Sequence, residues 1–179
     1  MEAKIGQAVL ELLQGDITEQ DTEAIVNAAN RSLLGGGGVD GAIHRAAGPQ
    51  LLAECRTLGG CETGDAKITK GYKLKARHVI HTVGPVYHSA GKTAPQLLAR
   101  CYRRSLEVAS ENKLKSVAFP SISTGAYGYP LEEAAPIAIK TVIDYLKGHP
   151  DIQLVRFVLF GKEAYQAYEK ALQDLLTKG

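Results

Sequence analysis

The stretch that decides the fold runs from residue 117 to residue 128 and reads Val117-Ala118-Phe119-Pro120-Ser121-Ile122-Ser123-Thr124-Gly125-Ala126-Tyr127-Gly128. A short apolar run, Val117 to Pro120, passes here into a loop of hydroxyl side chains and glycine. Comparable apolar or β-branched runs occur at four other places: Ala8 to Leu13, Ala24 to Asn27, His78 to Val83 and Leu154 to Phe160. Each run is short and ends at a Gly, Pro or Asn, which predicts buried strands.

Helical patterns lie between these runs. Apolar residues share one face of Ala94 to Asn112, and Thr93 followed by Gln96 matches the capping box of a helix start. Two further helices are expected near Glu132 to Lys147 and Lys162 to Leu176. Strands that alternate with helices of this length predict an α/β protein, a three-layer α/β/α sandwich with a largely parallel central sheet. Its ligands should lie beyond the carboxyl ends of the strands.

One helix boundary stays open in this pattern. Pro136 conflicts with an early start of the helix near Glu132, because a proline inside a helix removes one backbone hydrogen bond.

Length and composition narrow the class of protein. With 179 residues the chain predicts a single domain, 1–179, at the usual size of about 150 residues per domain. The formal net charge is only +2, from 21 Lys+Arg and 19 Asp+Glu, so a nucleic-acid partner is not expected. No apolar run approaches the ~20 residues that cross a bilayer, and the start of the chain lacks a signal-peptide pattern. We expect a soluble, cytoplasmic protein with no membrane partner.

The three cysteines, Cys55, Cys61 and Cys101, form no CxxC pair and no zinc-finger spacing. We interpret them as reduced thiols that pack in the interior.

Two glycine loops follow predicted strands. Gly35 to Gly38 precedes a short helical stretch, Val39 to Ala47, and Ser121 to Gly128 leaves the strand that ends at Pro120. Backbone N–H groups in such loops can form an anion nest at a helix start. One glycine loop alone could equally be a flexible turn, whereas two at equivalent positions favour a ligand site.

Neither glycine loop matches the Walker A or the GxGxxG pattern, so NTP hydrolysis and Rossmann-type redox chemistry are not expected. Backbone amides, helix ends and the hydroxyls of Ser121, Ser123 and Thr124 could hold a diphosphate without lysine or metal. The two loops therefore predict a dinucleotide-like ligand and no cofactor.

Longer motifs extend this pattern over nearly the whole chain. They are Gly15-Asp16-Ile17-Thr18, Ile25-Val26-Asn27-Ala28-Ala29-Asn30, the run from Leu34 to Gly48, Thr63-Gly64-Asp65-Ala66, Val79 to Pro85 and Ala118 to Gly128. In this order they resemble macrodomains of the MacroD type. The resemblance implies a mixed central sheet flanked by helices, a cleft for ADP-ribose and hydrolysis of esters on its distal ribose. It implies mono-ADP-ribosylated Asp or Glu side chains of proteins and O-acetyl-ADP-ribose as substrates, and we expect a monomer.

The resemblance also assigns the ligand-binding residues. Asp16 would accept a hydrogen bond from the adenine amine, Ile17 would add backbone and apolar contact, and Phe160 would stack on adenine. From the residues alone, Asp16 could equally be a helix cap and Phe160 a core residue. Asn27 and Asn30 would meet ribose hydroxyls. The remaining contacts would come from Gly37, Gly38, Val39, Asp40, Ser121, Ser123, Thr124, Gly125, Ala126 and Tyr127, the last bracing the distal ribose.

The catalytic residues implied are Asp40, Asn30 and His44. Asp40 follows the glycine loop, where a carboxylate can orient or deprotonate a water, with a substrate phosphate oxygen as an additional base. Its alternative role is a first-turn helix residue stabilised by the helix dipole. His44 lies one turn later on the same helical face and could orient the water or simply be packed. No GxSxG elbow is present, so a serine nucleophile is not expected.

The other histidines show no ligand pattern. His78 and His81 should point to opposite faces of one strand, and we assign no role to either, nor to His88 or His149.

Two alternative functions share the same pocket. One is a reader module that binds ADP-ribose without hydrolysing it. The other is a phosphatase for ADP-ribose with a distal phosphate, or a poly(A) RNA binder, which the near-neutral charge disfavours.

Overall fold

The computed structural model describes residues 1–178. The strands are β1 (Glu2–Ile5), β2 (Ala8–Gln14), β3 (Ala24–Ala29), β4 (Ala66–Lys70), β5 (His78–Val83), β6 (Ser116–Phe119) and β7 (Leu154–Leu159). The helices are α1 (Gly38–Ala47), α2 (Pro49–Arg56), α3 (Tyr87–Ala90), α4 (Ala94–Glu111), α5 (Leu131–Gly148) and α6 (Lys162–Lys178). Two short 3-10 helices, η1 (Ile17–Glu19) and η2 (Gly91–Thr93), complete the list.

All seven strands form one mixed sheet in the order β1-β2-β7-β6-β3-β5-β4. The five central strands, β2, β7, β6, β3 and β5, are parallel, and the edge strands β1 and β4 pair antiparallel to their neighbours. The five strands predicted from apolar runs are therefore confirmed, with ends that differ by at most two residues. β1 was not predicted, because it is four residues long and mostly exposed.

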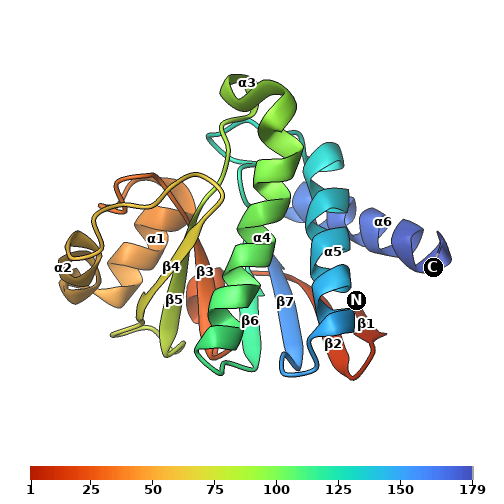
Figure 1. Ribbon diagram of the computed structural model, residues 1–179, viewed down its shortest axis with the longest axis horizontal. Helices are drawn as coiled ribbons and strands as arrows, with labels where there is room; N and C mark the ends of the chain where they lie inside the picture. The colour runs from red at the N-terminus through yellow and green to blue at the C-terminus, as the bar shows by residue number, and fades with distance from the viewer. Residues whose placement is uncertain (179) are drawn as a thin grey trace.

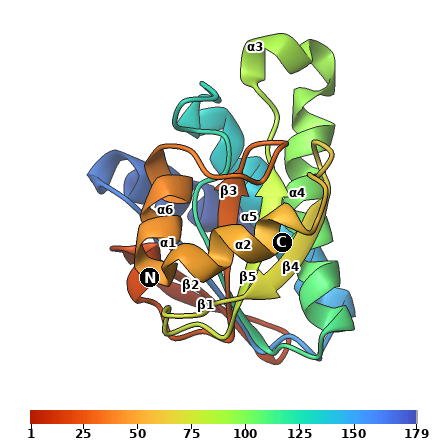
Figure 2. The same ribbon diagram turned by 90° about the vertical axis from the view of Figure 1, so that its left-hand side faces the viewer.

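Helices cover both faces of the sheet, which confirms the three-layer α/β/α sandwich (Figure 1). One core cluster joins α4, α5 and α6 to the sheet, with Tyr102, Phe119, Phe157 and Tyr168 among its fully buried side chains. A second, smaller cluster packs α1 and α2 against the other face. Figure 2 faces this second side and shows α1 and α2 in front of the strands.

Two details of the helices differ from the sequence-based expectation. The capping box at Thr93 is wrong, because the chain is already helical in η2, and the Thr93 hydroxyl donates back to the Ala90 carbonyl at 2.7 Å. α5 begins at Leu131, so Pro136 lies inside it. Pro136 is exposed, and its ring therefore meets solvent rather than the core.

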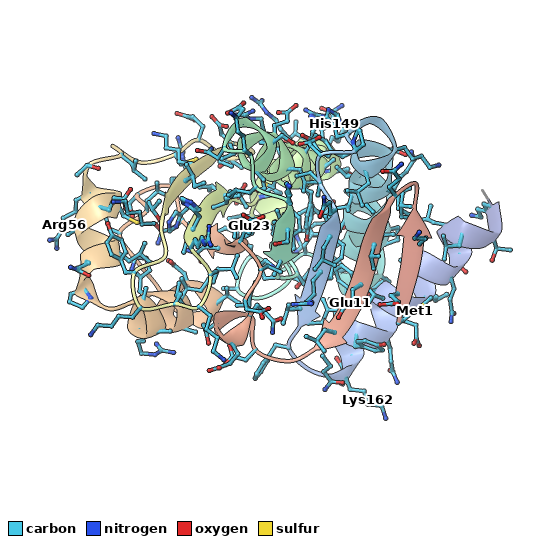
Figure 3. All side chains as sticks on the ribbon, turned by 90° about the horizontal axis from the view of Figure 1, so that it is seen from below. Met1, Glu11, Glu23, Arg56, His149 and Lys162 are labelled. Carbon is cyan, nitrogen blue, oxygen red and sulfur yellow. The ribbon has the colours of Figure 1, made fainter. Side chains whose placement is uncertain are left out.

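Figure 3 views the molecule from below and shows the start of the chain beside β2. Met1 lies just before β1 and beside Glu11 of β2, and the Met1 carbonyl accepts a hydrogen bond from Leu12 N at 2.8 Å. Arg56, at the end of α2, lies on the far side of the molecule from Lys162, at the start of α6 (Figure 3). Among residues 1–178, no helix has both the length and the apolar character needed to span a membrane.

Candidate active site

Both glycine loops follow parallel strands, β3 and β6, and lie at the carboxyl edge of the sheet (Figure 1). β3 and β6 are neighbours in the sheet, so the loop that follows β3 and the loop that follows β6 leave it side by side. Gly35 and Gly38 have φ angles of 92° and 56°, in the left-handed region that glycine adopts without strain. Gly37 is the N-cap of α1 and offers no capping side chain. The first-turn N–H groups of α1 are thus left for a ligand.

A cleft of about 730 Å³ runs along this edge. Eight of the predicted ligand-binding residues line it: Asp16, Ile17, Gly38, Val39, Ser121, Thr124, Gly125 and Phe160. Its volume lies within the range of small-molecule sites, about 300–1,000 Å³.

The β2 and β7 end of the cleft combines a carboxylate with an exposed aromatic ring. Asp16 Oδ1 caps η1 by accepting from Thr18 N at 2.9 Å and from Thr18 Oγ1 at 2.7 Å, while Asp16 remains exposed in the cleft. Asp16 therefore both caps η1 and lines the cleft. Phe160 is 91% exposed, so it is not a core residue.

The loop after β6 is held from below by two buried tyrosines. Ser121 Oγ lies 2.8 Å from the hydroxyl of Tyr168, which lies 3.3 Å from that of Tyr102. Thr124 Oγ1 donates to Ser121 Oγ at 2.8 Å, and Tyr102 accepts from Ile122 N at 3.0 Å. This network, with residues from α4 and α6, fixes the backbone of a loop that lines the cleft.

Ser123 takes a strained position in the same loop. Its φ is 68°, and its buried hydroxyl has no hydrogen-bond partner among the described residues. The hydroxyl packs against Gly84, where an added Cβ would collide with it. Ser123 therefore faces the sheet rather than the cleft. Ala126 and Tyr127 are more exposed but do not line the cleft either, and neither does Gly37.

Asp40 is buried beneath the first glycine loop and is only 5% exposed. Its Oδ1 accepts from Asn27 Nδ2 at 2.8 Å. His44 Nε2 lies 3.3 Å from the same oxygen, without the geometry of a hydrogen bond. Asp40 lies in the first turn of α1, so the carboxylate also faces the positive end of that helix.

Asn30 approaches Asp40 across Gly36. A Cβ on Gly36 would lie 3.2 Å from Asp40 Oδ2 and 3.4 Å from Asn30 Nδ2, which brings both polar groups to one point under the loop. The Asn30 amide is fixed on both sides, because Nδ2 donates to Gly35 O at 2.8 Å and Oδ1 accepts from Ser32 Oγ at 2.7 Å. The carboxylate and the amide could jointly orient a small molecule such as water.

Asn27 does not reach the cleft, in contrast to its predicted contact with a ribose. Its side chain is fully buried, and Nδ2 also lies 3.1 Å from Nδ1 of His81. His81, to which the sequence assigned no role, therefore belongs to the polar group around Asp40. The sequence alone does not give the register between β3 and β5, and it is this register that places Asn27 opposite His81.

Two cations in the cleft were also missed, Arg45 of α1 and Lys162 of α6. Arg45 follows Gly38 and Ala42 at helical spacing, and all three line the cleft. Among residues 1–178, no group of three or more His, Cys, Asp or Glu side chains could hold a metal ion. The three cysteines are buried and free, and burial raises the pKa of each to about 11.

Comparison with known proteins identifies a family. The Macro domain family model matches residues 26–138. A macro domain-containing protein of Chlorobaculum tepidum is 58% identical over 164 residues, which cover 92% of this chain and 95% of that protein. The ADP-ribose glycohydrolase MACROD2 of Xenopus laevis is 56% identical, over 92% of this chain and 40% of that protein. The structure of the Oceanobacillus iheyensis macrodomain with ADP has a TM-score of 0.97 and 48% identity, over 100% of this chain and 97% of that one.

Proposed function

This chain belongs to the Macro domain family, and from that premise we propose that it binds ADP-ribose and hydrolyses esters on the distal ribose. The substrates would be mono-ADP-ribosylated Asp and Glu side chains of proteins and O-acetyl-ADP-ribose. The observation that carries the proposal is the convergence of Asp40 and Asn30 at Gly36, beside a cleft of nucleotide size. The relatives named for ADP-ribose hydrolysis and the ADP-bound structure support the same class of ligand.

The order of the strands suggests how the ligand would lie. Asp16 and Phe160 follow β2 and β7, the second loop follows β6, and Asn30 follows β3, in the order of the sheet. Adenine would lie at the β2 and β7 end, with its amine toward Asp16 and its ring on Phe160. The diphosphate would meet the second loop and the start of α1. The distal ribose would then reach Asn30 and Asp40.

The charge of a diphosphate would be met by three sources in the cleft. The first turn of α1 offers N–H groups and the positive end of the helix dipole. Gly125 brings backbone close to the ligand, and Thr124 adds a hydroxyl. Arg45 adds a cation that forms no ion pair among the described residues.

Asp40 would hold the attacking water through its second carboxylate oxygen. Oδ1 is occupied by Asn27, whereas Oδ2 faces Gly36 and the Asn30 amide. Water adds to the ester, the bond between sugar and acyl group breaks, and the products are ADP-ribose and a free carboxylic acid. Asp40 or a substrate phosphate oxygen takes a proton from the water and returns it to the leaving oxygen, and the N–H groups of the loops stabilise the charge that develops.

A reader module is the second candidate, and one observation favours it. Asp40 is only 5% exposed, so its carboxylate has little access to a ligand unless the glycine loop moves. Binding and turnover must therefore be measured separately.

The test is release of ADP-ribose from a glutamate-linked mono-ADP-ribosylated protein, with EDTA present. Wild type should release it, and Asp40→Ala and Asp40→Asn should lose turnover by about 100-fold or more while still binding ADP-ribose by calorimetry. Glu62→Ala, at an exposed side chain outside the cleft, is the matched control and should behave as wild type. Binding without turnover by wild type would overturn the hydrolase proposal for this ester and leave the reader.

A further inference from the structure

Asn27 and His81 are polar residues in the middle of an apolar layer. They are direct partners in the parallel register of β3 and β5, and both side chains are fully buried. Their neighbours on the same face, two residues before and after, are Ile25, Ala29, Val79 and Val83, all packed under α1 and α2. Buried polar groups are costly unless they are paired. The hydrogen bonds of Asn27 and His81 explain why two polar side chains are tolerated in this apolar layer.

The hydrogen bonds of Asn27 determine where the proton of His81 lies. Asn27 Nδ2 carries two hydrogens, and its two neighbours are Asp40 Oδ1 at 2.8 Å and His81 Nδ1 at 3.1 Å. His81 Nδ1 must then be the acceptor, so the ring proton lies on Nε2. Nε2 lies 2.9 Å from Thr69 Oγ1, which can donate onward to the carbonyl of Lys70 at 3.1 Å. Hydrogen bonds thus connect Thr69 of strand β4, through His81 and Asn27, to the Asp40 carboxylate, and Asn27 donates to both of its neighbours.

Burial keeps the His81 ring neutral, which this series of hydrogen bonds requires. It lowers the pKa of His81 to about 3, with a smaller contribution from His44, whose ring centre lies 6.5 Å away. The other titratable groups that face this cluster are Asp40 and Cys55, and burial raises the pKa of the Cys55 thiol to about 11. A protonated His81 would direct an N–H at the Asn27 amide, which is itself a donor.

The orientation of the Asn27 amide leaves its oxygen without a hydrogen bond within residues 1–178, and the neighbouring groups explain why this orientation is kept. Asn27 Oδ1 is buried and has no hydrogen-bond partner among the described residues. A rotated amide would place that oxygen against the Asp40 carboxylate. The carboxylate therefore keeps the NH2 group on its side, and His81 Nδ1 accepts the second hydrogen of that group, although the amide oxygen is left unpaired.

We propose that His81 is a positioning residue of the hydrolysis: its Nδ1 lone pair orients the Asn27 amide, which holds Asp40 Oδ1 and leaves Oδ2 facing Asn30. The inference rests on the proposed function, because it assigns a role in that reaction. None of His81, Asn27 and Asp40 lines the cleft. Loss of the Nδ1 acceptor should therefore lower kcat and leave ADP-ribose affinity unchanged.

Two amide variants separate the two nitrogens of the ring. In His81→Asn the new amide oxygen can take the place of Nδ1, whereas in His81→Gln the new amide reaches the place of Nε2 and Thr69. We expect His81→Asn to keep kcat within about 3-fold of wild type, and His81→Gln to lower it about 10- to 100-fold, because small misplacements of a catalytic group have effects of this size. Both should bind ADP-ribose as wild type does, by calorimetry. A merely structural role would lower the two activities equally and would shift the two melting temperatures equally.

Equal kcat losses in the two variants, or full activity of His81→Gln, would overturn the proposal. Crystal structures of both variants give a readout that needs no turnover: the Asn27 Nδ2 to Asp40 Oδ1 contact should persist in His81→Asn and be lost in His81→Gln. If wild type itself shows no turnover, the proposed function fails, and the contact alone decides the positioning role. Its persistence in His81→Gln would count against the inference.

Variants of Thr69 cover the case in which the His81 variants do not fold. Thr69→Val removes the acceptor for Nε2–H and frees the ring to place its proton on Nδ1. We expect kcat to fall several-fold at unchanged affinity, about the effect of one lost hydrogen bond, and Thr69→Ser to restore it. Unchanged kcat in Thr69→Val, or no rescue by Thr69→Ser, would contradict this series of hydrogen bonds.

Discussion

The hydroxyl of Tyr168, on the last helix, lies 2.8 Å from Oγ of Ser121 in a loop that lines the cleft. Tyr168 is fully buried and reaches Ser121 from the face of the sheet opposite α1 and α2. A side chain of the core thus sets the shape of the loop proposed to bind phosphate.

Tyr168→Phe should weaken ADP-ribose binding about 3- to 10-fold, because the loop loses one hydrogen bond worth about 1 kcal/mol. kcat should change less than about 2-fold at saturating substrate, since Asp40 and Asn30 lie on other elements. Calorimetry and initial rates measure the two effects. Tyr165→Phe is the matched control, because Tyr165 bonds to the amino terminus of Met1 and not to the loop. A lower kcat with unchanged affinity in Tyr168→Phe would contradict this role.

Phe160→Ala should raise the Kd for ADP-ribose by about 10-fold, since stacking of a base on an aromatic ring contributes about 1–3 kcal/mol. The melting temperature should stay within about 1 °C, because the side chain is 91% exposed and buries almost no surface in the fold. Phe157→Ala on the same strand is the contrasting variant. Its ring is fully buried, so its loss should destabilise the protein by about 3–5 kcal/mol. Unchanged affinity in Phe160→Ala would argue against stacking.

Gly36→Ala should lower kcat about 10-fold or more with little change in Kd. The added methyl would lie 3.2 Å from Asp40 Oδ2 and 3.4 Å from Asn30 Nδ2, in the space proposed for the attacking water. Gly148→Ala is the control, because a Cβ there meets nothing within 4 Å and Gly148 ends a helix far from the cleft. Steady-state kinetics with the ester substrate provide the measurement, and a wild-type kcat in Gly36→Ala would place the water elsewhere.

Stability should fall on acidification because of His81. Its pKa is lowered to about 3 in the folded protein, whereas an unfolded histidine titrates near 6.5, so only the unfolded chain gains a proton between these values. The contribution of His81 is complete above pH ~6.5 and decreases by about 1.4 kcal/mol per pH unit below it. Urea unfolding at pH 7 and pH 5 should show this loss in wild type and a smaller one in His81→Gln. His88→Gln, at an exposed histidine, should retain the full loss.

The sequence predicted the centre of the sheet better than its edges. Central strands such as β6, with Val117, Ala118 and Phe119 fully buried, read as short apolar runs, whereas β1 is mostly exposed and polar. The loops of the site were predicted because glycines and hydroxyls are local signals. The pairing of Asn27 with His81 was not, because it joins residues 54 positions apart through strand register. The burial of Ser123 was missed for a similar reason, since it depends on contact with Gly84.

The place of β2 beside β7 has a consequence for how this protein is made. The two strands come from opposite ends of the chain, with Leu12 paired to Phe157, so the loop between them closes late and slowly. Asp16 follows the first strand and Phe160 the second. A chain emerging from the ribosome would therefore contain both glycine loops well before it contains the proposed adenine site. With the ligand oriented as proposed, ADP-ribose would stabilise the fold only after β7 has been synthesised.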